Sequence, residues 1–435
     1  MNSGQTSAAP HGALIIPRVR FELPGGAVLL VSRRPKAPVT AVRIHMKGGI
    51  LTDPVGWEGL SEWVGGLLDQ GTANMDEAAI ADAIEPYGGS VAGDATGLRG
   101  SMAGDEWRRL LDVMFELVAQ PRFPDGPVGV QIERLKTHMA VQEEDPRVQG
   151  GRTFRRLVYG DHRMALPNNG TSEILAQVSA ADLRAHHDKN WCRARAIIAV
   201  CGDVDPEEVH QHLLRRIDDW NPGTPFERGE QVFPERSTRV EAFEKGREQV
   251  HVYFGHLGVE RKIEDYPALV VMDHVLGSGP GFVNRLSKKL RDEQGLAYTV
   301  YGDIHQSAGL LPGMFTAYIG TSPEHVERAV HGIRAEVRAM LAEPVSQEEL
   351  DMAKDYVTGS MVLGYERASR RAASLIAQEV HGFAADHLET LRQAYAAVTV
   401  ADVQATAQRH LFPEAACLAA AGSVSTEALR SMLGA

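Results

Sequence analysis

An arginine and a tyrosine stand seven residues apart in the stretch LSKKLRDEQGLAYTVYG, residues 286–302. The guanidinium of Arg291 and the phenol of Tyr298 are both hydrogen-bond donors, so together they could stabilise a carbonyl oxygen that gains negative charge in a reaction. Losing one such donor typically raises an activation barrier by about 3 kcal/mol. Taken singly, Arg291 is also typical of a solvated cation at a helix end, and Tyr298 of a half-buried residue in a strand.

The positions of these two residues depend on a helix end between them. Gly295 lies between Arg291 and Tyr298, and a glycine commonly ends a helix. We therefore expect Arg291 on the last turn of a helix and Tyr298 on the strand that follows. Two elements could then direct both side chains to one point.

A glycine-rich loop, GSGPGF, precedes this stretch and contains Gly277, Gly279, Gly281 and Phe282. It lacks the GxGxxG spacing and the lysine of phosphate-binding loops, and it follows a helix, so we do not interpret it as a phosphate site. Without further information it is consistent with a tight connection between two helices.

A third feature is the helical pattern EGLSEWVGGLLDQGT, residues 58–72, which has two adjacent glycines in its middle. Each glycine costs roughly 1 kcal/mol relative to alanine in a helix interior. Gly65 and Gly66 are explained most simply if they allow the helix to pack closely against a neighbour.

The sequence shows no standard metal-binding motif. Neither HExxH nor HxxEH occurs, and the histidine pairs of the chain have no accompanying base at a useful spacing. None of the three cysteines belongs to a CxxC motif, and Cys201 and Cys417 lie in apolar runs typical of buried strands.

Length and composition are those of a soluble multidomain protein. The 435 residues exceed the size of one hydrophobic core, and no apolar run is long enough for a membrane span. The net charge of −12 disfavours nucleic acid as a partner. The start of the chain does not resemble a secretory signal, so we expect a cytoplasmic protein that does not bind membranes; a periplasmic location is the alternative if a signal has been removed.

An internal repeat defines the architecture. VSAADLRAHHDKNWCRARAIIAVCGDV, residues 178–204, aligns without a gap with VTVADVQATAQRHLFPEAACLAAAGSV, residues 398–424. Each copy predicts a capped helix, a polar connection and an apolar strand that ends at glycine. A looser correspondence links residues 83–104 with residues 289–320. The chain therefore consists of two copies of one unit of about 200 residues.

The repeat predicts an α+β fold in which each copy has a mainly antiparallel sheet with helices packed on one face. We place the domains at residues 13–218 and 239–435, with a linker at 219–238 where proline, glycine and charge replace periodicity. Long helices are expected at residues 75–85, 106–119, 128–142, 325–341 and 347–361, the last with a Ser346 cap.

The stretch LPGGAVLLVSRRPKAPVTAVRIHMKGGILTDPVGWEGLSEWVGGLLDQGT resembles the opening of insulinase/pitrilysin-type zinc metallopeptidases, the group that contains mitochondrial processing peptidase. The resemblance extends over nearly the whole chain, including ERLKTHMAVQEEDPR and LSKKLRDEQGLAYTVYG. It implies two duplicated α+β domains that form a half-shell.

The zinc motif of that family, HxxEH, is degenerate in this chain. In the alignment Glu62 occupies the first histidine position, Gly65 the position of the catalytic glutamate, and Gly66 the second histidine position. The third family ligand falls near His138, with Glu143 close by. The resemblance therefore implies no zinc or other cofactor in this chain, although a rearranged site of Glu62, His138 and Glu143 stays open as a minor alternative.

Arg291 and Tyr298, in contrast, match an Arg/Tyr pair that family peptidases use to bind the substrate and stabilise its tetrahedral intermediate. The loop of Gly277, Gly279, Gly281 and Phe282 resembles the substrate-facing loop of the non-catalytic subunit of mitochondrial processing peptidase.

The resemblance therefore implies the non-catalytic subunit of a heterodimeric zinc metalloendopeptidase. This chain would donate Arg291 and Tyr298 in trans to a peptide at the zinc site of a homologous HxxEH-bearing partner. The alternatives are a scaffold subunit of the same fold without a part in catalysis, and an autonomous metallopeptidase with unusual ligands.

Overall fold

The chain folds into two compact units in a computed structural model that describes residues 13–280 and 283–433. Unit 1 comprises the described residues up to Met139, together with Pro167–Gln231 and Val362–Glu389. Unit 2 comprises Ala140–Leu166, Val232–Met361 and the described residues from Thr390 onward. Each half of the sequence thus contributes a segment to the unit formed mainly by the other half, a feature that the division at 219–238 did not include.

The sheet of unit 1 has the strand order β1-β2-β6-β3-β5-β4. All neighbouring strands are antiparallel except the parallel pair β2 and β6. The strands are β1 (Val19–Glu22), β2 (Val28–Arg33), β3 (Val39–Met46), β4 (Ser90–Asp94), β5 (Gly97–Ala103) and β6 (Ala196–Gly202).

The sheet of unit 2 has the order β7-β11-β8-β10-β9, again with one parallel pair, β7 and β11, among antiparallel neighbours. Its strands are β7 (Val240–Glu244), β8 (Val250–Leu257), β9 (Ala297–Asp303), β10 (Met314–Thr321) and β11 (Cys417–Gly422). Apart from the extra strand β1, the two orders match position by position. The predicted duplication and the α+β fold class are therefore confirmed.

The aligned helices of the repeat begin with the same cap. At α7 (Ala180–Asn190), the Asp182 N–H donates to Ser179 Oγ and the Ser179 N–H donates to the Asp182 carboxylate. At α14 (Val400–His410), Thr399 and Asp402 form the same reciprocal pair. Such a box satisfies backbone donors that a helix start would otherwise leave without partners.

Helices cover one face of each sheet, and the apolar side chains between them form the core of each unit. Unit 1 has α1 (Leu60–Gly66), α2 (Glu77–Ile84), α3 (Trp107–Ala119), α6 (Ser172–Leu175), α7 and α8 (Pro206–Leu214). Unit 2 has α9 (Tyr266–Asp273), α10 (Val326–Ala342), α14 and α15 (Thr426–Leu433). The chain crosses from one unit to the other within α4 (Asp125–Glu144), α11 (Gln347–Gly364) and α13 (His387–Ala397).

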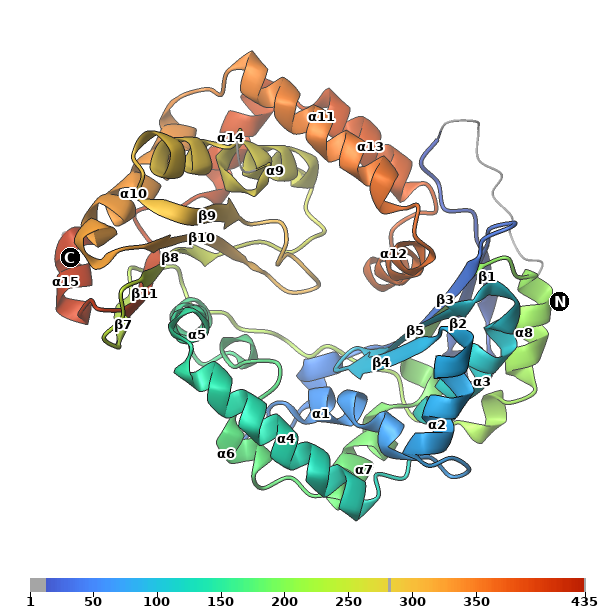
Figure 1. Cartoon of the computed structure of the whole chain (residues 1–435). Coiled ribbons are helices and arrows are strands. Elements are labelled where there is room, and N and C mark those ends of the chain that lie inside the picture. The colour runs from blue at the N-terminus through green and yellow to red at the C-terminus, as the bar shows by residue number, and fades with distance from the viewer. Residues whose placement is uncertain (1–12, 281–282, 434–435) are drawn as a thin grey trace. The chain divides into compact units, whose positions relative to one another are not determined.

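The opposite face of each sheet is covered by one helix from the other half of the sequence (Figure 1). Helix α5 (Pro146–Tyr159) packs on β8 and β11 of unit 2, where Phe154 stacks on Tyr253 with ring centroids 6.0 Å apart. Helix α12 (Ala368–His381) packs on β3 and β6 of unit 1 through the buried Leu375 and Ile376. The two halves therefore exchange equivalent helices.

The expected long helices are present with small shifts at their ends, as α2, α3, α4, α10 and α11. Ser346 caps α11, because its Oγ accepts from the Glu349 N–H. Cys201 and Cys417 are buried free thiols in β6 and β11, as predicted. Within the described part of the chain, no helix is both long enough and apolar enough to cross a bilayer.

Candidate functional site

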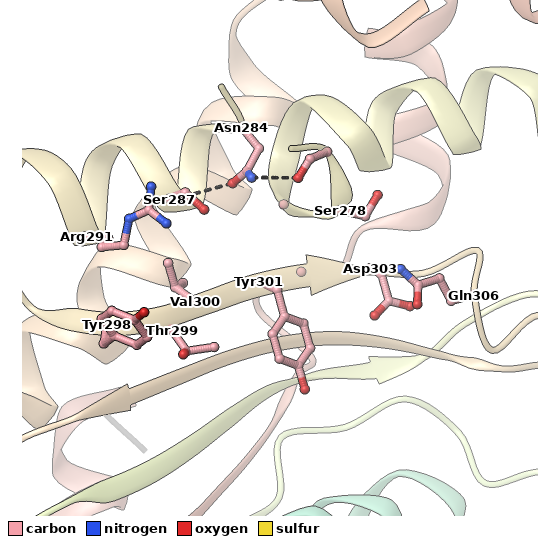
Figure 2. Close-up of a pocket in the computed structure, with 13 residues that line it drawn as sticks. Ser278, Asn284, Ser287, Arg291, Tyr298, Thr299, Val300, Tyr301, Asp303 and Gln306 are labelled. Atoms are coloured by element: carbon pink, nitrogen blue, oxygen red, sulfur yellow. Dashed lines mark hydrogen bonds between the residues drawn. The ribbon is translucent and has the colours of Figure 1, made fainter. Parts of the chain in front are cut away.

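A cavity of about 810 Å³ in unit 2 contains both residues of the predicted Arg/Tyr pair (Figure 2). It lies along β9, which is the last strand in the order of its sheet. The lining residues are Gly277, Ser278, Gly279, Asn284, Ser287, Arg291, Tyr298, Thr299, Val300, Tyr301, Gly302, Asp303 and Gln306.

Arg291 and Tyr298 lie on the two elements that the sequence predicted. Arg291 is near the end of the helical segment η10 (Ser287–Glu293), which has π rather than α geometry, and Tyr298 is on β9. Gly295 between them has φ of +63°, a conformation that glycine adopts without strain. Figure 2 shows the two side chains at the same end of the cavity. Their role in catalysis remains a prediction.

The two side chains are held differently. Arg291 donates from Nε to Asp292 Oδ1 at 2.8 Å and from Nη2 to Oδ2 at 3.3 Å. This interaction with Asp292, helped by the nearby Tyr298, raises the pKa of Arg291 above its ordinary value. Tyr298 is 92% exposed. An exposed phenol beside a permanently charged guanidinium offers donors to a ligand that enters the cavity.

The glycine-rich loop forms another wall of the cavity. Gly277 and Gly279 line it, whereas Gly281 and Phe282 lie outside the described residues. Asn284 fixes this loop, because its Nδ2 donates to Gly279 O at 3.1 Å and its Oδ1 accepts from the Ser287 N–H at 2.9 Å. Sequence reasoning missed Asn284, although an asparagine directly before a helix is a capping signal and its Oδ1 here accepts from the third residue of the helix that begins at Arg285.

The far end of the cavity is acidic. Asp303 ends β9 and lines the cavity with Gln306, and the charge of Asp273, whose side chain is fully buried, acts on it. Burial, together with the charge of Asp273, raises the pKa of Asp303 to about 7. Sequence reasoning also missed Asp303, since nothing in the local pattern indicates that α9 brings a second carboxylate next to it.

The helix with two adjacent glycines is α1, and it packs against β4. A Cβ atom on Gly65 would lie 2.1 Å from the carbonyl oxygen of Asp94, and one on Gly93 would lie 2.0 Å from the carbonyl oxygen of Gly65. Gly65 therefore allows two backbones to touch, which confirms the packing interpretation for this residue. The interpretation is wrong for Gly66, which is exposed and would place a Cβ within 4 Å of no other group.

Unit 2 has the equivalent contact beside its cavity. A Cβ on Gly277 would lie 2.4 Å from the backbone nitrogen of Gly302 on β9. In both units, then, a glycine near the end of the first helix allows close approach to the strand at the edge of the sheet. The close contact that Gly65 allows in unit 1 is therefore repeated at Gly277 in unit 2.

The other residues of the degenerate zinc motif have structural surroundings. Glu62 is half-buried and accepts from the Ala95 N–H at 2.9 Å, in the turn that joins β4 and β5. Burial raises the pKa of Glu62. His138 is exposed on α4. Among the described residues, no three His, Cys, Asp or Glu side chains are placed to hold a metal ion, so the rearranged site with Glu143 gains no support.

Comparison with known proteins finds several that are similar to this chain. The profile described as peptidase M16 inactive domain matches residues 177–357. An uncharacterized zinc protease of Mycobacterium tuberculosis is 26% identical over 98% of this chain and 99% of its own length. A Helicobacter pylori protein named as a non-peptidase homolog is 24% identical, over 77% of each chain.

Solved structures share the fold. The crystal structure of a peptidase M16 inactive domain from Pseudomonas fluorescens superposes with a TM-score of 0.86, at 22% identity, over 94% of this chain and 99% of that one. A protease from Helicobacter pylori superposes with a TM-score of 0.84, at 16% identity, over 94% of this chain and all of that one.

Proposed function

We propose that the chain is the non-catalytic subunit of a heterodimeric zinc metalloendopeptidase, because residues 177–357 match the peptidase M16 inactive domain and nearly the whole chain is similar to proteins named as zinc proteases. In this proposal Arg291 and Tyr298 act in trans on a peptide that is held at the zinc ion of a homologous partner. The partner supplies HxxEH, with its metal ligands and its general base, and this chain supplies hydrogen-bond donors.

The observation that supports this function best is the placement of Arg291 and Tyr298 on one cavity. They come from different elements, yet both line the same cavity, and the Tyr298 side chain is almost fully exposed. A large aromatic side chain stabilises a fold mainly by being buried. The exposed Tyr298 therefore contributes little to the stability of unit 2. A phenol and a guanidinium at one point suit the oxyanion of a tetrahedral intermediate.

The helix α1 supports the need for a partner. Two glycines stand where HxxEH has its glutamate and its second histidine, and glycine has no side chain that could bind zinc or move a proton. Glu62, at the first histidine position, is already engaged by the Ala95 N–H. The residues of this helix therefore do not fit a zinc site, and zinc chemistry in the complex is assigned to the other subunit.

The test is peptide cleavage by the complex reconstituted from both subunits. Arg291→Ala and Tyr298→Phe are each expected to lower kcat by about 100-fold, the usual effect of removing one oxyanion donor. Arg430→Ala and Tyr356→Phe are matched controls, because Arg430 is an exposed arginine on α15, and Tyr356 is an exposed tyrosine; neither lines the cavity. Neither control should change kcat.

The alternatives predict other outcomes. Normal cleavage by a complex that carries both changes would favour the scaffold subunit, which takes no part in catalysis. Stoichiometric zinc in the isolated chain would favour an autonomous metallopeptidase. Purification from the native organism that recovers only homodimers would contradict the heterodimer.

A further inference from the structure

A row of three tyrosines crosses the sheet of unit 2 on the face that α5 covers. Tyr301 on β9 lies directly opposite Tyr318 on β10, and Tyr318 lies directly opposite Tyr253 on β8. The ring centroids are 5.0 Å apart in both pairs. Residues that face each other across neighbouring strands share one face of the sheet, so the three rings form one continuous aromatic surface.

This surface holds the guanidinium of Arg147, the second residue of α5. The Arg147 Cζ lies 5.0 Å from the centroid of the Tyr318 ring, which is the geometry of a cation–π contact. The Tyr253 O–H donates to the Arg147 carbonyl oxygen at 2.8 Å, and the guanidinium donates to the phenol oxygen of Tyr301. All three tyrosines therefore fix the position of Arg147.

The electrostatics of α5 do not explain an arginine at this position. No carboxylate forms an ion pair with Arg147 in the described part of the chain, and Asp145 accepts from its backbone N–H, at 2.8 Å, rather than from its guanidinium. The first turn of a helix carries the positive end of the helix dipole, where a cation is disfavoured. Arg147 is nevertheless held there and is exposed to solvent. Its charge is therefore available to an anionic ligand.

The row of tyrosines ends at the cavity that contains Arg291 and Tyr298. Tyr301 lines this cavity, and Figure 2 shows its side chain extending from β9 away from Arg291. Because β9 is the last strand in the order of its sheet, an extended peptide can lie along it and place alternate side chains on the two faces. Tyr298 and Tyr301 are three residues apart, which corresponds to roughly 10 Å of extended chain. A peptide residue two to four positions from the bond at Tyr298 therefore lies near Tyr301.

The groups that remain for a ligand at this end of the row are donors. A guanidinium has five N–H donors and no acceptor, and its planar fork matches the two oxygens of a carboxylate. The Tyr301 oxygen accepts from Arg147, so the phenol keeps its own O–H proton for a ligand. The other two phenols are engaged, Tyr318 with His251 Nδ1 at 2.9 Å and Tyr253 with the Arg147 carbonyl. The chemistry of this place is therefore that of a carboxylate site.

We propose that Arg147 and Tyr301 bind a carboxylate of the substrate peptide and so determine specificity for peptides with a negative charge about three residues from the cleaved bond. This inference rests on the proposed function, because Tyr298 marks the place of cleavage. The carboxylate belongs either to an aspartate or glutamate side chain or to the C-terminus of the peptide, which share this chemistry.

The experiment uses a neutral, acetylated and amidated peptide in which one glutamate is moved along the sequence. Binding to the full chain is measured by fluorescence anisotropy, and cleavage positions are mapped with the reconstituted complex. We expect about tenfold tighter binding with glutamate two to four residues from the cleaved bond than with glutamine there, because hydrogen bonds to a charged group are stronger than those to a neutral one. A parallel peptide without glutamate that ends in a free carboxylate at this position distinguishes the two sources of the charge.

Arg147→Gln should abolish the preference for glutamate while the glutamine peptide binds as before, which also shows that the variant is folded. Tyr301→Phe keeps the ring and removes one donor, so the preference should fall to about threefold. Arg156→Gln is the matched control and should leave the preference unchanged. Arg156 is an exposed arginine of the same helix that pairs with Glu241, and it lies nine residues further along α5, roughly 13 Å away at 1.5 Å per residue.

A preference for glutamate that is unchanged in Arg147→Gln overturns this inference, and so does equal binding of all the glutamate and glutamine peptides to the wild type. Unchanged cleavage by the Arg291→Ala and Tyr298→Phe complexes overturns the proposed function instead, and the binding assay still reports on Arg147. The two proposals therefore fail in different measurements.

Discussion

Replacing Gly65 by alanine tests how α1 is held against the sheet of unit 1. Alanine is ordinarily the better helix residue by about 1 kcal/mol. At this position, however, its Cβ would lie 2.1 Å from the carbonyl oxygen and 2.5 Å from the carbonyl carbon of Asp94. Both atoms belong to the backbone of β4, so no side-chain rotation relieves the overlap. The helix and the strand must move apart.

The size of the effect follows from the cost of overpacking. Forcing an extra carbon into a packed interior costs about 1–3 kcal/mol, and separating α1 from β4 also loosens the buried contacts of Trp63 and Val64. We therefore expect Gly65→Ala to lose about 2–3 kcal/mol of unfolding free energy. In a unit of this size that corresponds to a fall in melting temperature of roughly 5–10 °C.

Gly66→Ala is the matched control. A Cβ there meets no group within 4 Å, and the residue is exposed at the helix end. The ordinary propensity of alanine then applies, and the variant should be as stable as the wild type or more stable by up to about 1 kcal/mol. The two adjacent substitutions should thus differ in sign.

The assay is thermal unfolding followed by tryptophan fluorescence. All five tryptophans of the chain lie in unit 1, and Trp63 is part of α1 itself, so the signal reports on the unit that contains the substitution. Equal melting temperatures for Gly65→Ala and Gly66→Ala would refute the close-packing argument. The argument would also fail if Gly65→Ala stabilised unit 1.

Three further predictions concern carboxylates. The unfolding of unit 2 is followed by calorimetry, because unit 2 has no tryptophan. Burial, together with the charge of Asp273, raises the pKa of Asp303 to about 7. The protonated Asp303 therefore contributes stability that is fully present below about pH 4 and is lost as the pH rises through 7. Asp303→Asn should be more stable than the wild type at pH 8 and equal to it at pH 4. Burial raises the pKa of Glu349, but Arg285 and Ser346 outweigh it and lower that pKa to about 2. The stability from these interactions is therefore present above about pH 4.5 and falls towards pH 2. Arg285→Met should weaken this pH dependence, with Ser346 left to supply the rest, and lose about 1–3 kcal/mol at pH 7. Burial raises the pKa of Glu62, so the charged carboxylate costs stability at high pH. Glu62→Gln keeps an acceptor for the Ala95 N–H and should stabilise unit 1 at pH 8 but leave its stability unchanged at pH 3. Tryptophan fluorescence during thermal unfolding measures both.

Local signals in the sequence predicted much of the fold. The Ser179 and Thr399 caps, each followed three residues later by an aspartate, identified two equivalent helices, and the strand orders confirm that they belong to duplicated units. Arg291 and Tyr298 were placed on the right elements because Gly295 marks the turn between them. These features depend on residues that are close in sequence.

Features that depend on distant residues were missed. The exchange of α5 and α12 has no local pattern, although β6 and β11 are apolar on both faces and so indicate that each sheet is covered twice. The proximity of Asp273 and Asp303 was missed for the same reason, since thirty residues separate two carboxylates that only the tertiary fold brings near each other. Tertiary packing decides such contacts, and local propensity does not.

The exchanged helices make the two halves of the gene product inseparable. A polypeptide that stops in the irregular segment before β7 would carry α5 without the sheet it covers and would lack α12, so one face of its own sheet would be bare apolar surface. The complementary fragment would carry α12 without the sheet it covers and would lack α5, so one face of its own sheet would be exposed as well. Each fragment alone should therefore aggregate, and co-expression should restore a soluble, nicked protein, because each piece carries the cover that the other one lacks.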